Sequence, residues 1–483
     1  MFVPILSAMI FCSFFGILFI IIIPSKKQLL IKKVAYVSSI CTFLFSLFLL
    51  VFFDSSCCKF QFVEWVEIIT FFNFNFFVGV DGISVFFIIL TTFLTPVCLL
   101  IEWSSKKKNF KEYYICFLLI NIFLIVVFSV LDVLVFYIFF ESILIPMFII
   151  IGIFGSKTRR VKAAYQFFLY TLFGSLLMLI SILIIFFETG STDFQILLTV
   201  EFSEKKQFIL WLAFFISFAI KIPMFPLHVW LPEAHVEAPT GGSVILAGVL
   251  LKMGGYGFLR FSLTFFPIAS IYFSPMIFIL SLFAILFTSL STLRQIDLKK
   301  IIAYSSVAHM GIVTIGIFSF NLYGIEGSFL MMVSHGFVSS ALFLLVGMLY
   351  EKHHTRLIKY YGGITQIMPL FSFFFLFFSI SNLGFPGTSS FSAEFLILFG
   401  CFQINTFVSF FSSFGMVLSA CYCLWFSNRL LFGQLNVFYI FQYNDLQKKD
   451  FAIVFPLAFF TVVLGVYPEM FLDIIHNCVS NLI

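Results

Sequence analysis

Long apolar runs follow one another from one end of the chain to the other, and short polar stretches separate them. Each run holds about 20 residues, the length at which an α-helix crosses a lipid bilayer. The pattern predicts about fourteen membrane-spanning helices. Their expected centres are residues 12, 43, 92, 121, 141, 174, 216, 251, 281, 308, 337, 385, 418 and 461. We therefore expect an all-α polytopic membrane protein that forms one membrane domain over residues 1–483.

Two of the predicted spans contain prolines in their interior. The seventh has Lys221-Ile-Pro-Met-Phe-Pro226, and the twelfth has Asn382-Leu-Gly-Phe-Pro-Gly387. Because proline removes a backbone donor and clashes with the preceding turn, both helices should break there. A break at membrane depth is tolerated where the backbone is buried in protein or lines a wet cavity. Paired broken helices in the two halves of a chain are typical of transporters built from repeats.

The spacing of chemically similar residues favours such a repeat. About five spans separate Lys221 from Glu394, and about five separate Glu141 from His309. Five is an odd number, so the two copies should be inverted with respect to each other. The expected order is N-terminal spans 1–3 (1–110), a first repeat of spans 4–8 (111–265), a second repeat of spans 9–13 (266–432) and a C-terminal span 14 (433–483).

Composition and charge agree with a membrane protein and predict its orientation. The chain is 62% hydrophobic and only 10% charged, whereas about a quarter of a soluble domain is charged. Lysine and arginine gather in alternate loops, such as 26–33, 106–111 and 157–162. The loops on the other side hold only Lys59, Lys205, Lys206 and Arg260. By the positive-inside rule, the basic loops should face the cytoplasm or matrix, and both termini the opposite side.

Ionisable side chains occur inside the apolar runs or beside the predicted breaks. They are Glu141, Lys221, Lys252, His309, His335 and Glu394. A charge at the bilayer centre costs about 2.5–3.5 kcal/mol even on the lenient insertion scale, so such residues are rare without a function. Glutamate, lysine and histidine each bind and release a proton. Their alternation along the chain therefore predicts a proton relay through the bundle.

Structural roles are the alternatives for these positions. Glu141 and Lys221 could form a static ion pair, and Lys252 could serve helix packing. His309 and His335 could be hydrogen-bonded core histidines. Each of these roles would make the residue part of the scaffold and not part of a relay.

Other features of the sequence exclude soluble-enzyme chemistry. The polar cluster His228, Glu233, His235 and Glu237 favours helix caps and loop hydrogen bonds over a metal site. The ten cysteines are scattered, and no Gly-rich nucleotide loop follows a strand pattern. The run Gly254-Gly255-Tyr256-Gly257 lies within a predicted span, where small residues let helices approach closely.

Two stretches resemble a known family. Residues 221–239, Lys-Ile-Pro-Met-Phe-Pro-Leu-His-Val-Trp-Leu-Pro-Glu-Ala-His-Val-Glu-Ala-Pro, resemble the signature of the antiporter-like membrane subunits of respiratory complex I, and so do residues 303–311, Ala-Tyr-Ser-Ser-Val-Ala-His-Met-Gly. The other types carry lysine where this chain has Glu394. The chain therefore resembles most the M-type branch, NADH dehydrogenase subunit 4, in its mitochondrial version.

The resemblance implies a role for each of the six residues. Glu141 and Lys221 would form a coupling pair, and Lys252 would be the central relay. His309 and His335 would link onward to Glu394, the terminal site that exchanges protons with the outer side. The chain itself would hold no redox centre. FMN, iron–sulfur clusters and ubiquinone would bind to partner subunits, and the neighbours would include the subunit 2-type and subunit 5-type antiporter-like chains and membrane lipids, with no nucleic acid.

The same resemblance leaves a second function open. The signature is shared with Mrp-type cation/proton antiporters and membrane-bound hydrogenases, so a subunit of one of these is the alternative to a proton-translocating subunit of NADH:ubiquinone oxidoreductase. A purely structural membrane subunit fits poorly with six ionisable residues in apolar runs. The expected location is the mitochondrial inner membrane, with the bacterial plasma membrane as the alternative.

Overall fold

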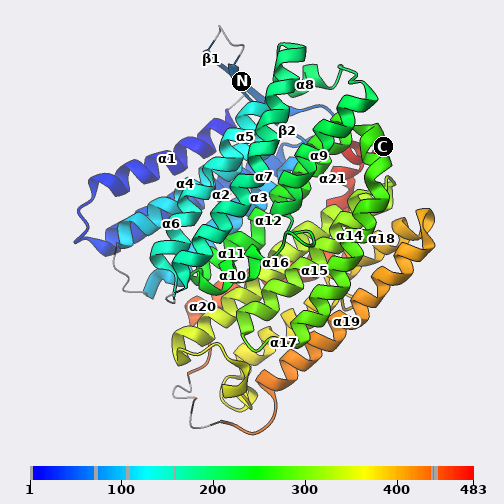
Figure 1. The fold of residues 1–483 in the computed structure, drawn as a ribbon. Helices are drawn as coiled ribbons and strands as arrows, with labels where there is room; N and C mark the ends of the chain where they lie inside the picture. Colours follow the sequence, from blue (N-terminus) through cyan, green and yellow to red (C-terminus); the bar gives the residue numbers. More distant parts are fainter. Residues whose placement is uncertain are drawn as a thin grey trace.

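Helices make up almost the whole fold and run side by side across the molecule (Figure 1). The computed structural model describes residues 4–69, 74–104, 109–156, 159–436, 439 and 444–482. Four of the basic residues in the predicted inner loops, Lys106, Lys107, Lys108 and Lys157, lie outside the described residues.

Several helices of the N-terminal half are split into shorter pieces. Their bounds are α1 (Ile5–Ile22), α2 (Gln28–Val51), α3 (Gly82–Ile101), α4 (Phe110–Ser129), α5 (Val133–Ser142), α6 (Leu144–Phe154), α7 (Arg160–Thr189), α8 (Phe194–Leu197), α9 (Glu204–Lys221), α10 (Trp230–Glu237), α11 (Thr240–Ile245), α12 (Leu251–Gly257) and α13 (Leu263–Phe265). Two π-helical stretches, η3 (Leu246–Leu250) and η4 (Phe258–Ser262), join α11, α12 and α13 into one continuous rod.

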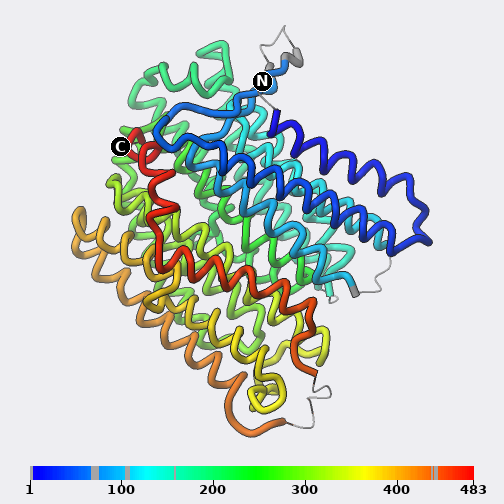
Figure 2. The backbone as a smooth tube through the Cα atoms, turned by 180° about the vertical axis from the view of Figure 1, so that it is seen from behind, coloured from blue at the N-terminus to red at the C-terminus, as the bar shows by residue number. Residues whose placement is uncertain are grey.

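The C-terminal half continues with longer helices. Their bounds are α14 (Pro267–Leu293), α15 (Leu298–Ile317), α16 (Leu322–His353), α17 (Pro369–Leu383), α18 (Ser389–Ile404), α19 (Thr406–Leu431), α20 (Lys448–Val466) and α21 (Glu469–Ser480). Seen from behind, α1 and α2 form one edge of the bundle and α20 crosses its back (Figure 2). The strands β1 (Gln61–Ile69) and β2 (Phe74–Val80) pair antiparallel as a hairpin between α2 and α3.

Twelve helical segments of the described chain are long and apolar enough to cross a membrane. Two shorter apolar helices, α17 and α18, and the more polar α9 complete the bundle. The prediction of an all-α polytopic membrane protein is therefore confirmed. The count of fourteen spans and the pair of inverted repeats stay predictions.

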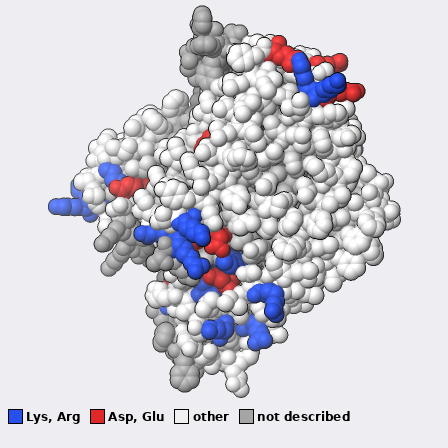
Figure 3. Space-filling model, in the orientation of Figure 1, with Lys and Arg blue, Asp and Glu red and all other residues white. Residues whose placement is uncertain are grey.

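The surface of the bundle has the character of a lipid-facing belt. Exposed positions on the outer helices are large and apolar, including Ile22, Phe187 and Phe407. Charged side chains gather in two zones near opposite ends of the helices, and a broad uncharged band lies between them (Figure 3). By contrast, the central helix α16 is buried over its apolar window. Such a distribution fits a molecule whose solvent is hydrocarbon around the middle and water at both ends.

Both predicted breaks are confirmed. α9 ends at Lys221, and the next helix, α10, begins only at Trp230. α17 ends at Leu383, where Gly384 takes the left-handed conformation with φ of 82°, and α18 begins at Ser389. Prolines occupy both gaps, and so the backbone cannot continue as a helix through either of them.

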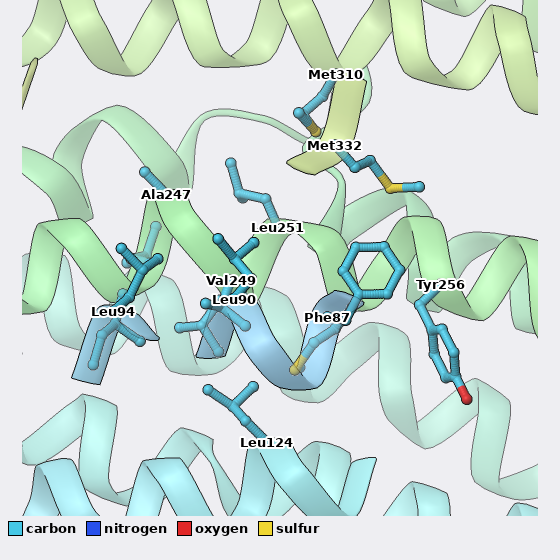
Figure 4. Close-up of a cluster of buried hydrophobic side chains, with 14 of the residues drawn as sticks. Phe87, Leu90, Leu94, Leu124, Ala247, Val249, Leu251, Tyr256, Met310 and Met332 are labelled. Atoms are coloured by element: carbon cyan, nitrogen blue, oxygen red, sulfur yellow. The ribbon is translucent and has the colours of Figure 1, made fainter. Parts of the chain in front are cut away.

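The core around the two broken helices is packed by aromatic and aliphatic side chains. Phe87, Leu90 and Leu94 of α3 and Leu124 of α4 meet Ala247, Val249 and Tyr256 of the rod, and Met310 and Met332 lie beside them (Figure 4). Small residues bring the rod close to α9, because a Cβ at Gly254 would lie 2.9 Å from the carbonyl oxygen of Phe218. The glycine run thus allows the close helix packing predicted for it.

One charged residue is placed differently from its prediction. Arg260 was expected in a loop on the outer side, but it is buried within η4. Its guanidinium lies 2.7 Å from the Asp81 carboxylate. The π-helical stretch prolongs the rod past the point where the apolar run weakens, and the ion pair with Asp81 offsets the cost of burying the charge.

Candidate functional site: a file of buried ionisable side chains

The six ionisable residues predicted to form a relay lie deep in the bundle, with one partial exception. Lys252 is 0% exposed, Glu394 is 1% exposed, and His309 and His335 are each 2% exposed. Lys221 is buried as well, whereas Glu141 is half-buried. They come from six elements, so only the tertiary fold brings any of them together.

Lys252 and His335 are in direct contact. The Lys252 Nζ lies 2.9 Å from the His335 Nδ1, a hydrogen bond that joins the rod to α16. The same ammonium donates to the carbonyl oxygen of Ala247 in η3. Ser339, one turn further along α16, places its hydroxyl 3.5 Å from the same ring nitrogen. A proton can therefore be shared between lysine and imidazole along an existing hydrogen bond.

His335 leads on to His309 and Glu394. The two imidazole rings are 5.8 Å apart between centroids, and the His309 Nδ1 lies 3.4 Å from the Glu394 Oε1. The His335 Nε2 and both nitrogens of His309 have no hydrogen-bond partner among the described residues. Buried polar atoms normally have hydrogen-bond partners, so three unpartnered imidazole nitrogens in one place call for an explanation.

Glu394 sits over the break between α17 and α18. Its Oε2 lies so close to Gly384 that a Cβ added there would be 2.5 Å from it. Gly384 combines this close approach with a positive φ, two requirements that only glycine meets easily. The broken helix therefore makes the space in which the carboxylate is held.

Glu141 and Lys221 are near each other but not in contact. Their charges interact, yet no ion pair within 4.0 Å joins these two described residues. The Lys221 Nζ instead lies 4.4 Å from the centroid of the Phe140 ring, which is next to Glu141 in α5. The Glu141 Oε1 is buried without a hydrogen-bond partner. Glu141 and Lys221, the first part of the predicted relay, are thus separated, whereas the side chains from Lys252 to Glu394 lie close to one another.

A histidine that the sequence analysis assigned to loop hydrogen bonding lies next to the file. His235 of α10 is 0% exposed, stacks on Phe343 with a ring separation of 4.6 Å, and has no partner at either ring nitrogen among the described residues. It lies within electrostatic reach of Lys252 and of Lys299, which lies in the first turn of α15. The crowding of His and Glu residues at 228–237 was the available signal, but spacing alone did not show which side chain turns inward.

Another ionic contact lies apart from the file, near the C-terminus. The Glu326 Oε1 at the start of α16 lies 2.7 Å from the His476 Nδ1 on α21. Glu326 is buried, whereas the His476 side chain is 56% exposed. This pair ties the C-terminal helix to α16. Within the described ranges, no group of three or more His, Cys, Asp or Glu residues is placed to hold a metal ion.

Known proteins share both the sequence and the fold. Residues 130–419 match the family described as NADH:quinone oxidoreductase/Mrp antiporter, TM. Proteins named NADH-ubiquinone oxidoreductase chain 4 are 57% identical in Marchantia polymorpha, covering 99% of this chain and 97% of the relative, and 58% identical in Chondrus crispus, covering 97% and 95%. This chain belongs to the NADH-ubiquinone oxidoreductase chain 4 family.

Solved structures agree with that membership. A chain of respiratory complex I from Thermus thermophilus with bound NADH matches with a TM-score of 0.90 at 26% identity, covering 99% of this chain and 98% of that one. A chain of the Mrp complex from Dietzia shares the fold, with a TM-score of 0.87 at 17% identity and coverage of 99% and 97%. The assignment to complex I is better supported than the antiporter alternative, because the chain 4 relatives are 57–58% identical over nearly the full length, whereas the Mrp chain is 17% identical.

Membership of the chain 4 family confirms the coarser predictions. The chain is a multi-pass inner-membrane subunit of the proton-pumping NADH:ubiquinone oxidoreductase, complex I, and it works with the other subunits of that assembly. The residues that carry protons within it are not assigned by the family match.

Proposed function

We propose that this member of the chain 4 family moves protons across the inner membrane through Glu141, Lys221, Lys252, His335, His309 and Glu394, in that order. The observation that carries the proposal is the file from Lys252 to Glu394, in which each side chain faces the next across the rod and helices α15, α16 and α18. A scaffold would need neither the unpartnered imidazole nitrogens nor four ionisable groups in one line.

Each step in this file moves one proton, and each histidine returns to its starting tautomer, by rotation of the ring or by proton exchange, before the next proton passes. A protonated Lys252 donates from Nζ to the neutral Nδ1 of His335, to which it is already hydrogen-bonded. The imidazolium then releases a proton from Nε2 towards His309, and His309 passes it to the Glu394 carboxylate. Histidine suits the middle positions because its two nitrogens accept on one side and release on the other.

The Glu141–Lys221 pair would act as the switch that loads this file. Lys221 lies in the last turn of α9, where the negative end of the helix dipole stabilises its ammonium. Approach of the Glu141 carboxylate would hold the proton on Lys221, and separation would release it towards Lys252. The membrane field opposes the transfer by about 2.3 kcal/mol per charge per 100 mV, so a modulation of a few kcal/mol is sufficient.

Protons would enter from the inner side through the region of α10. A cavity of about 310 Å³ is lined by Arg159, Glu237, Asp297 and Lys300, among others. Glu237 is buried, and its Oε2 has no partner among the described residues. His235 of the same helix lies within electrostatic reach of both Lys299 and Lys252. The arrangement supports His235 as a second group that can reload Lys252, beside the route through Lys221.

Redox chemistry would belong to the neighbours of this chain. FMN, iron–sulfur clusters and ubiquinone would bind in partner subunits of complex I, and subunit 2-type and subunit 5-type chains would flank this one. The chain would divide into N-terminal spans at 1–110, inverted repeats at 111–265 and 266–432, and a final span at 433–483. The corresponding breaks after α9 and α17 support the repeat.

The test is proton pumping by the intact complex in sealed vesicles, measured alongside NADH-driven quinone reduction. Lys252→Gln should lower pumping about tenfold, which corresponds to about 1.4 kcal/mol in the transfer barrier. Lys206→Gln removes a lysine whose side chain is 52% exposed and should leave pumping unchanged. Full pumping by an assembled Lys252→Gln complex would overturn the relay.

A further inference from the structure

A cavity of about 520 Å³ lies at the end of α19 that we predict to face the inner side, far from the relay in the bundle core. One wall is the last turn of α19 with the residues that follow it, and the other is the segment between α16 and α17. The lining residues are Ile296, Leu357, Ile358, Lys359, Tyr361, Gly362, Trp425, Asn428, Arg429, Phe432, Gly433 and Gln434.

The charge of the cavity has one sign. Among the lining residues that the structure describes, Lys359 and Arg429 are the only cations, and none is a carboxylate. Both cations are exposed, and Lys359 lies 4.9 Å from the centroid of the Tyr360 ring. A single-signed basic cavity attracts an anion. Trp425 adds a half-buried ring with an apolar body and a polar edge, the kind of side chain that concentrates at the boundary between lipid and water.

An apolar stripe on α19 leads to the cavity. Large side chains recur on its exposed face at helical spacing, at Phe407, Phe410, Phe414, Val417 and Leu424. From Phe407 to Arg429 the helix rises by roughly 33 Å, about the thickness of the hydrocarbon core. The cavity therefore opens at the end of a lipid-facing surface, at the depth where headgroups begin.

The walls of the cavity are fixed by hydrogen bonds between segments distant in sequence. The Gly363 N–H donates to the carbonyl oxygen of Phe432 at 3.1 Å, and the Thr365 hydroxyl donates to that of Leu431 at 3.1 Å. The Ile358 N–H donates to the carbonyl oxygen of Ile296 at 3.0 Å. A site held open in this way needs little reorganisation to receive a ligand.

We propose that this cavity binds the headgroup of an anionic phospholipid, with the acyl chains lying along the apolar stripe of α19. Arg429 would hold the phosphate with two parallel N–H donors, and Lys359 would add a second positive charge. A lipid matches both features of the site at once, since its phosphate meets the cations and its hydrocarbon meets the stripe. A protein segment covering this face would need its own carboxylates to do the same.

The test is photo-crosslinking of a radiolabelled phosphatidylglycerol analogue, with a photoreactive acyl chain, to the detergent-solubilised intact complex. We expect labelling of the α19 peptide around residues 421–436. Lys359→Gln with Arg429→Gln should lower this labelling about thirtyfold, because each cation contributes about fivefold to the binding of an anionic lipid. The control, Lys26→Gln with Lys27→Gln, removes two exposed lysines from another predicted inner loop and should change nothing.

Further arms separate the other occupants. Arg429→Lys keeps the charge and should retain most of the labelling, which distinguishes lost binding from lost folding. Excess unlabelled phosphatidylglycerol should compete, whereas phosphatidylcholine and inorganic phosphate should not. Equal labelling of the doubly substituted complex, competition by phosphatidylcholine, displacement by inorganic phosphate, or an unlabelled wild-type peptide shielded by a neighbouring subunit would each overturn the proposal.

Discussion

The two ends of the predicted relay differ in how closely their side chains meet. From Lys252 to Glu394, the hydrogen bond to His335 and the 3.4 Å approach of His309 to the carboxylate form a nearly closed line. At the other end, Lys221 rests on the Phe140 ring, and Glu141 does not reach it. Groups that are already this close need only small adjustments to pass a proton, whereas the separated pair must move further. We therefore propose that conduction runs from Lys252 to Glu394 and that gating takes place at Glu141 and Lys221.

The largest expected effect comes from removing the end of the joined segment. Glu394→Gln keeps the shape of the side chain but can no longer take up and release a proton. Pumping should fall about a hundredfold, since proton transfer by a positioned group typically contributes at least about that much. Vesicle pumping with assembled complex is the measurement. Glu326→Gln, a buried carboxylate outside the file, is the matched control and should pump normally.

A smaller effect is expected from disturbing the space around that carboxylate. Gly384→Ala places a Cβ against Glu394 and forces a positive φ on alanine, which costs about 1–3 kcal/mol. We expect pumping to fall about fivefold and the complex to unfold at a lower temperature. Gly190→Ala has the same backbone strain, with φ of 73°, but open space around it. Equal losses of pumping in the two variants would show that strain alone is responsible.

The smallest effect is expected at the separated end. Phe140→Leu removes the ring beneath the Lys221 ammonium, an interaction worth about 0.5–2 kcal/mol. The balance should shift towards the Glu141-paired state and slow pumping about twofold, as measured by initial rates. Phe139→Leu makes the same change one residue away, where the ring packs on Phe123 and not on a lysine. A difference between the two variants sharpens the switch model, and identical rates would contradict the role of the ring.

The sequence was sufficient for the features that depend on local chemistry. Prolines after Lys221 and Leu383 predicted the two breaks, and the apolar runs predicted a helical membrane protein. The sequence could not predict which of these side chains touch each other, because His335 and Lys252 are 83 residues apart along the chain. His335 proves to be the nearer of the two histidines to Lys252, and His309 the nearer to Glu394.

Two misassigned residues show where local reasoning fails. We expected Arg260 in a loop because the apolar run becomes less regular around it. The π-helical turns of η4 instead extend the rod through this residue, and Asp81, which is distant in sequence, forms an ion pair with it. His235 looked like a loop residue because of its polar neighbours, but α10 turns it against Phe343. In both cases the side chain is placed by a partner that is distant in sequence, and the residues around it in the sequence do not indicate that partner.

The coupling of Glu141 and Lys221 is the central claim, and a double-mutant cycle on pumping tests it most directly. Glu141→Ala, Lys221→Ala and the double variant would be compared at equal levels of assembled complex, with NADH-driven quinone reduction measured in parallel. If the two residues act as one switch, each single variant loses about tenfold and the double variant loses little more. If the single losses multiply, to about a hundredfold in the double variant, the residues act independently and the switch is wrong.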